Sequence, residues 1–261
     1  MEKLLLVKIG GNVIDAPAEL AAFLDDFSAL PGRKLLVHGG GKLATDLAAT
    51  LGITTQMIDG RRITDAETLK VVTMVYGGLI NKTLVSGLQA RGCNALGLTG
   101  ADADSVRAGK RRHPHIDFGY VGDIERVDTA ALQTLLGAGL VPVFAPLTHD
   151  GRGQMLNTNA DTLAAALASA LSGRYDITLI YCFDKKGVLA SSREDDVVPL
   201  LTPADYQQLK AGGVISKGML PKLDEAFAAL QHGVASVVLC HASQLRQAAA
   251  PASNAGTRLR L

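Results

Sequence analysis

Two glycine-rich turns follow short apolar runs near the start of the chain. The first is Lys-Ile-Gly-Gly-Asn at residues 8–12, and the second is His-Gly-Gly-Gly-Lys at residues 38–42, just before a helical pattern over residues 43–51. Glycines let backbone N–H groups approach a phosphate closely, and the N-terminus of a helix favours an anion. Lys8 would lie at the end of a buried strand, where an unpaired ammonium is costly to desolvate. The two turns and Lys8 together indicate an anion site.

The spacing of these turns differs from that of the known phosphate-binding motifs. The chain has no Gly-x-Gly-x-x-Gly and no Gly-x-x-x-x-Gly-Lys-Ser/Thr, so it has neither the dinucleotide nor the P-loop signature. A single turn of this kind is explained equally well by packing, because glycines are common where a strand meets a helix. The presence of two turns favours function.

Two later segments place polar residues at predicted helix starts. Residues 157–161 read Asn-Thr-Asn-Ala-Asp ahead of a strong helical pattern, and residues 212–222 lead into another helix. Asn159 and Asp161 could simply cap a helix and complement its dipole. Lys222 could be a solvent-facing lysine. Taken singly, each segment favours the structural explanation.

Short runs rich in Leu and β-branched residues alternate with longer amphipathic runs. We predict strands at residues 4–9, 34–38, 94–98, 141–145, 177–182 and 236–239, with helices between them. This alternation predicts an α/β fold with a mostly parallel sheet and helices on both faces. The glycine turns would then lie at the carboxyl edge of the sheet, the usual ligand side. Residues 56–64 and 118–127 each place a glycine between short alternating runs, which predicts two hairpins at one end of the sheet.

The composition limits the possible partners. Of the 261 residues, 26 are Lys or Arg and 25 are Asp or Glu, so a net charge of +1 gives no overall field toward nucleic acid or an anionic membrane. Cys93, Cys182 and Cys240 are far apart and form no Cys-x-x-Cys pair, which argues against a zinc module or a disulfide framework. The first apolar run is too short for a signal peptide or a membrane span. We expect a cytoplasmic protein that binds neither nucleic acid nor membrane.

A basic stretch at residues 107–115 is the segment that comes nearest to a nucleic-acid patch. It has no interleaved aromatic residues and lies among turn residues, so we predict a solvated loop. Further along, an Ala-rich helical pattern ends at Gly173 before a new strand. We place a lobe boundary there, with an N-terminal lobe over residues 1–173 and a C-terminal lobe over residues 174–261 in one continuous sheet.

Five motifs occur together in order along the chain. They are Lys-Ile-Gly-Gly at residues 8–11, His-Gly-Gly-Gly at 38–41, Asp-Gly-Arg-Arg-Ile-Thr at 59–64, Leu-Asn-Thr-Asn-Ala-Asp at 156–161 and Gly-Met-Leu-Pro-Lys at 218–222. With Gly-Thr-Arg at residues 256–258, they make the whole chain resemble the acetylglutamate kinases of the amino-acid kinase superfamily. The last two motifs separate this branch from aspartate, glutamate 5-, uridylate and carbamate kinases. The resemblance implies a three-layer α/β/α sandwich that phosphorylates the side-chain carboxylate of N-acetyl-L-glutamate with ATP, in arginine biosynthesis.

The resemblance also implies roles for individual residues in phosphoryl transfer. Lys8 and Lys222 would flank the transferred phosphoryl group, and Asp161 would hold both lysines in place. Backbone amides at Gly10, Gly11 and Gly40 would complete an anion cage. These roles make physical sense, because phosphoryl transfer depends mainly on positioning and charge stabilisation. An attacking carboxylate is already ionised at neutral pH, so no general base is needed.

The resemblance assigns the two substrates to separate lobes. The acylglutamate would bind to the N-terminal lobe, where Arg62 grips its α-carboxylate, Asn157 hydrogen-bonds near it, and the backbone of Gly40 and Gly41 meets the reacting end. ATP would bind to the C-terminal lobe at Asp184, Lys185, Lys186, Gly187, Val188, Leu189, Val214, Ile215 and Ser216. Mg²⁺ would arrive with ATP on phosphate oxygens and water, since the sequence shows no dedicated cluster of metal ligands.

Two features depart from the pattern of this family. Phe183 replaces the usual Thr or Ser before Asp184. Lys185 and Lys186 are added after Asp184. The two lysines could contact phosphates or lie in a solvated loop. Arg61 stands where Leu or Met is usual near the acyl pocket. An arginine there would suit an acyl group that ends in a carboxylate, so N-succinyl-L-glutamate is an alternative substrate.

Two further expectations concern assembly and rival functions. Arginine-inhibited members of the family carry an extra N-terminal helix, which has no room before a first strand that starts at about residue 3. We therefore expect a homodimer that arginine does not inhibit. A non-catalytic sensing or storage protein on the same fold is the rival from another class, although it would not need both Lys8 and Lys222.

Overall fold

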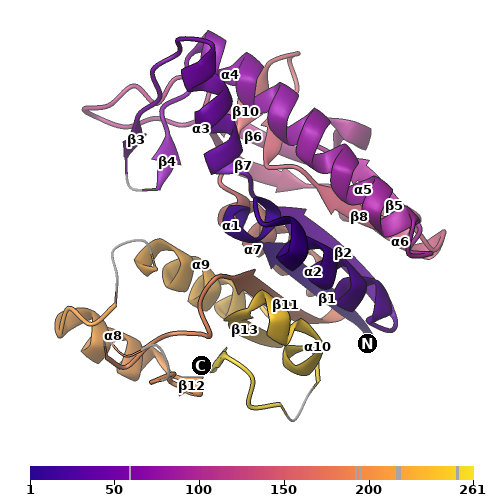
Figure 1. Ribbon diagram of the computed structural model, residues 1–261, viewed down its shortest axis with the longest axis vertical. Helices are drawn as coiled ribbons and strands as arrows, with labels where there is room; N and C mark the ends of the chain where they lie inside the picture. Colours follow the sequence, from indigo (N-terminus) through magenta and orange to yellow (C-terminus); the bar gives the residue numbers. More distant parts are fainter. Residues whose placement is uncertain (59, 192, 194–195, 216–218, 251–252) are drawn as a thin grey trace.

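The computed structural model describes residues 1–261 except 59, 192, 194–195, 216–218 and 251–252. Its centre is an eight-stranded sheet (Figure 1). From edge to edge the strands are β12 (Leu200–Leu201), β14 (Thr257–Leu259), β13 (Ser236–His241), β11 (Tyr175–Phe183), β1 (Glu2–Ile9), β2 (Arg33–His38), β8 (Val141–Phe144) and β5 (Ala95–Leu98). All six predicted strands are in this sheet and run parallel to one another. The predicted mostly parallel sheet is confirmed.

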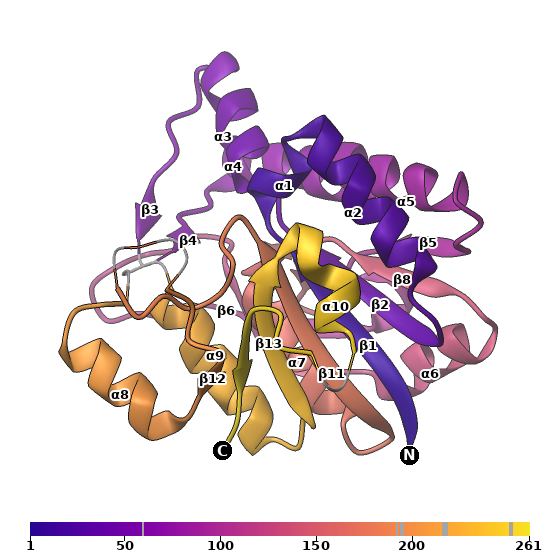
Figure 2. The ribbon, with the colours of Figure 1, turned by 60° about the horizontal axis from the view of Figure 1, so that its bottom comes forward.

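Helices cover both faces of this sheet, as Figures 1 and 2 show. One face packs against α6 (Thr129–Gly137), α7 (Ala160–Leu171), α8 (Pro203–Ala211) and α9 (Leu220–Gln231). The other face packs against α1 (Gly11–Ile14), α2 (Pro17–Ala29), α3 (Gly41–Thr50), α4 (Ala66–Val72), the π-helix η1 (Thr73–Ile80), α5 (Asn81–Gln89), the short 3₁₀ turn η3 (Ala242–Gln244) and α10 (Leu245–Ala248). The fold is therefore the expected three-layer α/β/α sandwich.

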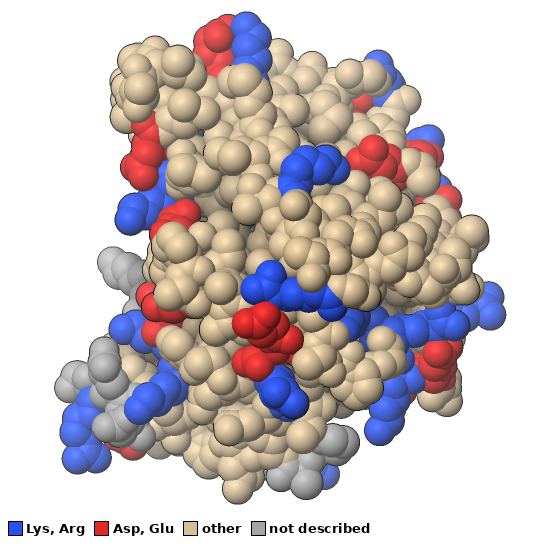
Figure 3. Space-filling model, turned by 45° about the vertical axis from the view of Figure 1, so that its right-hand side comes forward, with Lys and Arg blue, Asp and Glu red and all other residues tan. Residues whose placement is uncertain are grey.

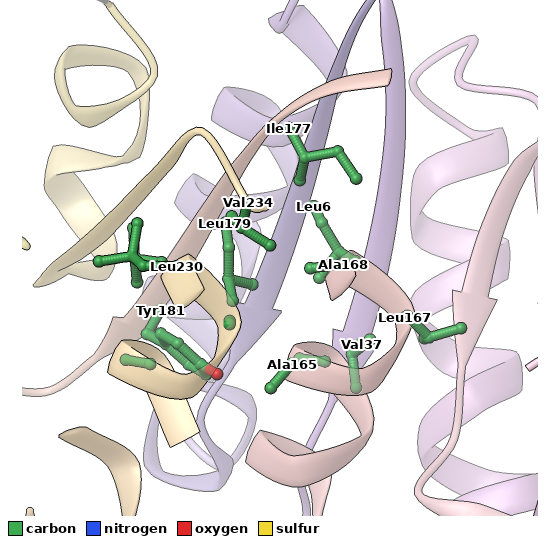
Figure 4. Close-up of a cluster of buried hydrophobic side chains, with 14 of the residues drawn as sticks. Leu6, Val37, Ala165, Leu167, Ala168, Ile177, Leu179, Tyr181, Leu230 and Val234 are labelled. Carbon is green, nitrogen blue, oxygen red and sulfur yellow. The ribbon is translucent and has the colours of Figure 1, made fainter. Parts of the chain in front are cut away.

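Alternation along β1 decides which helices can meet Lys8. Successive side chains of a strand point to opposite faces of the sheet. Leu4 and Leu6 belong to the core beneath α7 and α9, whereas Val7 and Ile9 belong to the core on the other face. Figure 4 shows Leu6 beside side chains of α7 in the first of these cores. Lys8 therefore projects from the sheet toward α7 and α9.

A smaller sheet and a hairpin lie beside the main sheet. The small sheet has the order β10 (Met155–Asn157), β9 (Leu147–His149), β6 (Val106–Lys110), β7 (Gly122–Val127), and the hairpin joins β3 (Met57–Ile58) to β4 (Arg61–Arg62). The predicted hairpin over residues 56–64 is thus confirmed. In Figure 2 it lies at the left side of the molecule, above α8, and both termini lie at the bottom.

The predicted hairpin over residues 118–127 is wrong. β7 is a single strand that pairs antiparallel with β6, and residues 111–121 form the loop between the two strands. Gly119 instead approaches the backbone of Thr64, where an added Cβ would lie 2.1 Å from the Thr64 oxygen. The alternation that predicted two short strands belongs to one strand, and its partner lies in the stretch that we expected to be a loop.

The basic stretch at residues 107–115 is therefore only partly a loop. Residues 106–110 form β6, with Arg107 hydrogen-bonded to Asp104 and Arg111 paired with Asp123 at 2.7 Å. A short 3₁₀ turn, η2 (Asp102–Asp104), precedes the strand. Asp104 and Asp123, which lie outside the strand, offset its positive charge. Figure 3 likewise shows both signs of charge interspersed over one face of the molecule.

The run from α4 through η1 to α5 is a continuous helix that passes over the sheet. By length and composition alone, its 24 residues, Ala66–Gln89, could cross a membrane, but 44% of the most apolar window is buried in the protein and core helices pass the same test.

The middle part of this helix is a π-helix, a rare conformation that is frequent at functional sites. η1 supplies Tyr76 and Ile80 to the carboxyl edge of the sheet, where the glycine turns lie.

Candidate active site

Lys8, Asp161 and Lys222 meet at the carboxyl edge of the main sheet. Lys8 lies near the end of β1, Asp161 in the first turn of α7 and Lys222 in the first turn of α9. Asp161 Oδ1 is 2.7 Å from Lys8 Nζ, and Asp161 Oδ2 accepts a hydrogen bond of 2.7 Å from Lys222 Nζ. The Lys222 side chain is only 11% exposed, so the alternative of a solvent-facing lysine is wrong.

Each charge in this group depends on the other two. Burial would raise the pKa of Asp161, but the ammonium groups of Lys8 and Lys222 outweigh burial and hold that pKa well below its usual range. Burial and the nearby Lys8 charge lower the pKa of Lys222 to about 8, against the opposing pull of Asp161. Asp161 is therefore the counter-charge that keeps two ammonium groups together in a buried place.

Local contacts fix the positions of Asp161 and Lys222. Asn159 caps α7, where its Oδ1 accepts hydrogen bonds from the backbone N–H groups of Asp161 at 2.8 Å and Thr162 at 3.1 Å. The cap predicted for Asn159 is thus confirmed. Lys222 Nζ lies 5.0 Å from the ring centroid of Tyr181 and 5.6 Å from that of Phe183, within cation–π range. Phe183, which departs from the family pattern, therefore has a place beside Lys222.

The two glycine turns lie against each other. A Cβ added to Gly11 would be 3.4 Å from the backbone nitrogen of Gly40, and one added to Gly40 would be 2.1 Å from Cδ1 of Ile80. Gly40 also has a φ of 145°, which side chains rarely allow. Both the backbone conformation and the close contact with Ile80 therefore require glycine at this position. Close contact of this kind brings the starts of α1 and α3 together beside Lys8.

The backbone amides of the turns differ in how they are used. Gly10 donates its N–H to the Cys182 oxygen at 2.9 Å, so this amide already has a partner in the sheet. Gly11 and Gly41 are the first residues of α1 and α3, and an N–H at the first position of a helix has no intrahelical acceptor. Of the predicted cage, Gly11 is therefore better placed than Gly10 to receive an anion, and Gly40 directly precedes the Gly41 amide, which has no intrahelical acceptor.

A buried histidine holds the second turn. His38 Nδ1 lies 2.8 Å from the Gly39 oxygen, and its Nε2 lies 3.3 Å from Nδ2 of Asn81, which also donates to the Val143 oxygen at 2.9 Å. Asn81 can only donate through Nδ2, so the imidazole carries its proton on Nδ1 and donates it to Gly39. Burial lowers the pKa of His38 to about 4, which keeps the ring neutral.

A cavity of about 150 Å³ opens beside the second turn. Its wall combines the second glycine turn, the β3–β4 hairpin, η1 and the start of α7, with Gly39, Gly40, Gly41, Met57, Gly60, Arg61, Arg62, Tyr76, Val121, Pro146, Asn157, Thr158, Asn159 and Ala160. All the residues predicted to bind the acylglutamate therefore border one cavity. Tyr76 joins them from the π-helix, and no sequence motif pointed to it.

Arg62 is the cation best fixed in this cavity. It is 6% exposed, and its Nη2 donates to the Gly41 oxygen at 2.7 Å and to Thr45 Oγ1 at 2.8 Å. Its Nη1 is buried and has no hydrogen-bond partner within the part of the chain that the structure describes. A buried donor without a partner is costly, so this nitrogen is suited to a ligand acceptor.

Asn157 belongs to the same wall through Thr64. Its Nδ2 donates to Thr64 Oγ1 at 3.0 Å, and the Thr64 hydroxyl donates to the Arg62 oxygen at 2.7 Å. These bonds tie β10 to the strand that carries Arg62. Asn157 therefore positions the hairpin, whatever else its side-chain oxygen binds.

The residues predicted to bind ATP follow β11 and precede α9. Asp184 accepts a hydrogen bond of 3.0 Å from Asn12 of the first glycine turn, which links the two predicted phosphate-binding loops. Val188 and Ile215 are buried in the core, whereas Val214 is exposed. Lys185 and Lys186 are exposed and Leu189 is half-buried. Ser216, like Asp59 and Gly218 of the sequence motifs, lies outside the described residues.

Gly187 shows how the nucleotide loop is held. An added Cβ would lie 2.6 Å from Thr257 Oγ1, and the same hydroxyl accepts the Val188 N–H at 2.8 Å. Thr257 belongs to β14, so the C-terminal Gly-Thr-Arg motif supports this loop from behind. The motif was noticed in the sequence, but its contact with Gly187 was not foreseen.

Comparison with known proteins agrees with this geometry. The sequence profile of the amino acid kinase family matches residues 3–241. The chain belongs to the amino acid kinase family. Acetylglutamate kinase from Bacteroides thetaiotaomicron is 55% identical to this chain over 260 residues, which is 99% of each protein. Acetylglutamate kinase from Cytophaga hutchinsonii is 54% identical over 261 residues, and that from Methanopyrus kandleri is 40% identical over 239 residues, or 90% of this chain and 93% of the relative.

Solved structures place the chain in the amino acid kinase fold. A protein from Streptococcus mutans UA159 superposes with a TM-score of 0.81 at 26% identity and covers 99% of both chains. N-acetylglutamate synthase from Neisseria gonorrhoeae, complexed with coenzyme A and N-acetyl-glutamate, gives a TM-score of 0.82 at 23% identity, over 99% of this chain and 59% of the synthase. The synthase likeness concerns the fold alone.

Proposed function

We propose that this amino acid kinase family member transfers the γ-phosphoryl group of ATP to the side-chain carboxylate of N-acetyl-L-glutamate, as a step of arginine biosynthesis. The observation that carries the proposal is the Lys8–Asp161–Lys222 group beside a cavity that contains Arg62. The names of the relatives given above, acetylglutamate kinases at 40–55% identity, support the same reaction.

The charges suit an in-line transfer between two anions. The side-chain carboxylate of the substrate attacks the γ-phosphorus, and the bond from that phosphorus to the β,γ-bridging oxygen breaks, so ADP leaves with the electron pair. Lys8 and Lys222 would neutralise the charge that collects on the phosphoryl oxygens and on the leaving oxygen. The N–H groups of Gly11 and Gly40 would receive equatorial oxygens. Asp161 would keep both lysines aimed at one point.

Arg62 would orient the substrate so that its side-chain carboxylate faces the phosphoryl group between Lys8 and Lys222. Nη2 is fixed by Gly41 and Thr45, and Nη1 remains to bind the α-carboxylate. A guanidinium anchored on one side loses little freedom when it binds a planar carboxylate. Asn157 and the backbone of Gly41 would complete the site at the reacting end.

ATP would bind on the C-terminal lobe, residues 174–261, and the acylglutamate on the N-terminal lobe, residues 1–173. The hydrogen bond from Asn12 to Asp184 supports this division, because it joins the first glycine turn to the loop that would bind ATP. Mg²⁺ would enter on the phosphates of ATP with water as its other ligand. Within the described part of the chain no group of three or more His, Cys, Asp or Glu side chains could hold a metal ion.

The rival function, a non-catalytic sensing or storage protein, has less support. A protein that only binds an acylglutamate has no use for two buried lysines around one carboxylate, because burying these charges is costly. The three charges are present with short contacts. A kinase explains that cost, and a sensor does not.

A homodimer in the cytoplasm, without nucleic acid or membrane, is the assembly that we propose. Met74 and Leu79 of η1 are 53% and 57% exposed, which leaves apolar surface on the long helix. A second copy of the chain would cover it. Light scattering after gel filtration should give twice the chain mass for the wild type and a lower mass for Leu79→Glu. A monomeric wild type would contradict the dimer.

A coupled assay of ADP release tests the proposed reaction. N-acetylglutamate, free glutamate, aspartate and carbamate are compared at equal concentrations, with and without Mg²⁺. The proposal expects ADP release that depends on the N-acylated substrate and is lost in Lys8→Met. Faster release with free glutamate or aspartate would contradict it, and so would full activity of Lys8→Met.

A further inference from the structure

Arg61 is a second arginine at the acylglutamate cavity. It precedes Arg62 on β4 and borders the same cavity. It also borders a neighbouring hollow of about 730 Å³, whose wall includes Asp123, Thr162 and Glu225. Arg61 therefore lies where the small cavity meets a wider space, and a ligand longer than the small cavity would have to pass it.

The Arg61 guanidinium has an unused donor. Its Nη1 is buried and has no hydrogen-bond partner, and Arg61 forms no ion pair within 4.0 Å, among the residues that the structure describes. The nearby acids are engaged elsewhere: Asp123 pairs with Arg111 at 2.7 Å, and Glu225 accepts the Thr162 hydroxyl at 2.9 Å. Burial, followed by the neighbouring charge of Arg111, lowers the pKa of Arg61. Asp123 and Glu225 oppose this lowering by their charge, although neither forms an ion pair or a hydrogen bond with Arg61 among the described residues. The buried Nη1 is therefore suited to an acceptor on a ligand.

That anion differs from the one that Arg62 would hold. Adjacent residues of a strand point to opposite sides, so the guanidinium groups of Arg61 and Arg62 do not converge on one carboxylate. On the proposed function, the α-carboxylate belongs to Arg62 and the side-chain carboxylate lies at Lys8 and Lys222. The remaining part of the substrate is its N-acyl group.

We propose that Arg61 binds a carboxylate at the end of the N-acyl group, so that the preferred substrate is a glutamate acylated by a dicarboxylic acid, with N-succinyl-L-glutamate as the simplest case. This inference rests on the proposed kinase function and deepens it. An acetyl methyl group would instead leave Arg61 without a partner when the ligand excludes water. N-acetylglutamate is then a poorer substrate of the same site.

The test compares kcat/KM for N-succinylglutamate and N-acetylglutamate in the wild type, in Arg61→Leu and in Arg174→Leu. Arg174 is exposed at the far end of the sheet, so its variant matches the change in charge and size without touching the cavity. We expect the wild type to prefer the succinyl compound. Arg61→Leu should lose on the order of 10- to 100-fold with the succinyl compound and little with the acetyl compound, as for one charge-assisted contact. Arg174→Leu should match the wild type.

Two results would overturn the inference while leaving the kinase function intact. They are faster wild-type turnover of the acetyl compound, and an Arg61→Leu variant that loses equally with both compounds. If neither acylglutamate is phosphorylated, the proposed function fails together with the inference.

A second measurement does not depend on the fold of a variant. Each acylglutamate is titrated into the wild-type protein without ATP, and the thermal midpoint is followed. The succinyl compound should raise the midpoint at a lower concentration than the acetyl compound. Equal or weaker stabilisation by the succinyl compound would contradict a role of Arg61 in binding.

Discussion

Lys222 donates a hydrogen bond of 2.7 Å to Asp161, and this bond joins α9 to α7 at the carboxyl edge of the sheet. The two helices pack on the same face of the sheet and belong to the two halves of the chain. Lys8 reaches the other oxygen of Asp161 from β1. One carboxylate thus sets the relative positions of a strand and two helices, so a change at Asp161 affects both the charge balance and the geometry.

Replacement of Asp161 tests this double role. Asp161→Asn keeps the shape but leaves two buried ammonium groups without a counter-charge. We expect kcat to fall about 100- to 1,000-fold and the free energy of unfolding to fall by about 3 to 5 kcal/mol. Steady-state kinetics and urea unfolding measure the two effects. Asp46→Asn, an exposed change of the same type, is the control, and wild-type activity in Asp161→Asn would refute the role.

The pKa of Lys222 predicts how activity depends on pH. This lysine is charged below its pKa of about 8 and loses its proton above it. kcat/KM for ATP, which reports the free enzyme, should therefore fall as pH rises through about 8. Lys222→Arg should lose activity through altered geometry but show no fall in this range, because arginine stays charged. The same alkaline fall in Lys222→Arg would assign it to another group.

His38 predicts how stability depends on pH. Its folded pKa of about 4 lies below its ordinary value of 6.5, so the unfolded chain binds the proton more strongly. The stabilising contribution is complete above pH 6.5 and is lost as pH falls toward 4, by up to about 3 kcal/mol. Urea unfolding between pH 7 and 4 should show a smaller loss in His38→Gln than in the wild type. His113→Gln, at an exposed position, should behave as the wild type, and equal slopes in all three proteins would contradict the prediction.

Gly40 and Ile80 form a matched pair for testing the second turn. Gly40→Ala should lower the free energy of unfolding by about 2 to 4 kcal/mol, since the new Cβ meets Cδ1 of Ile80 at 2.1 Å and strains the backbone. Ile80→Val removes that Cδ1, so the double variant should recover part of the loss. Gly52 has a φ of 74° with open space around it, so Gly52→Ala measures the cost of a left-handed backbone without any steric contact. No recovery in the double variant would argue against the contact.

The parts of the fold that were predicted carry local signals. Each of the six central strands is an apolar run between turn residues, and Asn159 stands directly before the helix that it caps. β6 was missed because ion pairs such as that of Arg107 occupy its exposed side, and the second hairpin was misplaced as a result. Pairing between strands distant in sequence has no signal within a short window.

The sequence predicted the site residues that stand in family motifs, but not those that reach the site through contacts between segments distant in sequence. Lys8, Asp161 and Lys222 were proposed together from motifs, and the structure brings them into contact. The roles of Asn81 and Tyr76 depend on a π-helix that passes over the second turn, and neither residue stands in a motif. Both lie on an apolar helix whose pattern fits a core helix equally well.

The fate of the phosphoryl group decides whether this protein makes an acyl phosphate. The protein is incubated with N-acetylglutamate and ATP labelled in its γ-phosphate, and hydroxylamine converts any acyl phosphate to a hydroxamate. We expect a label on the acylglutamate, a hydroxamate at the side-chain carboxyl group, and loss of both in Lys222→Met. Release of labelled inorganic phosphate without a trapped hydroxamate, or a full yield from Lys222→Met, would contradict the proposed reaction.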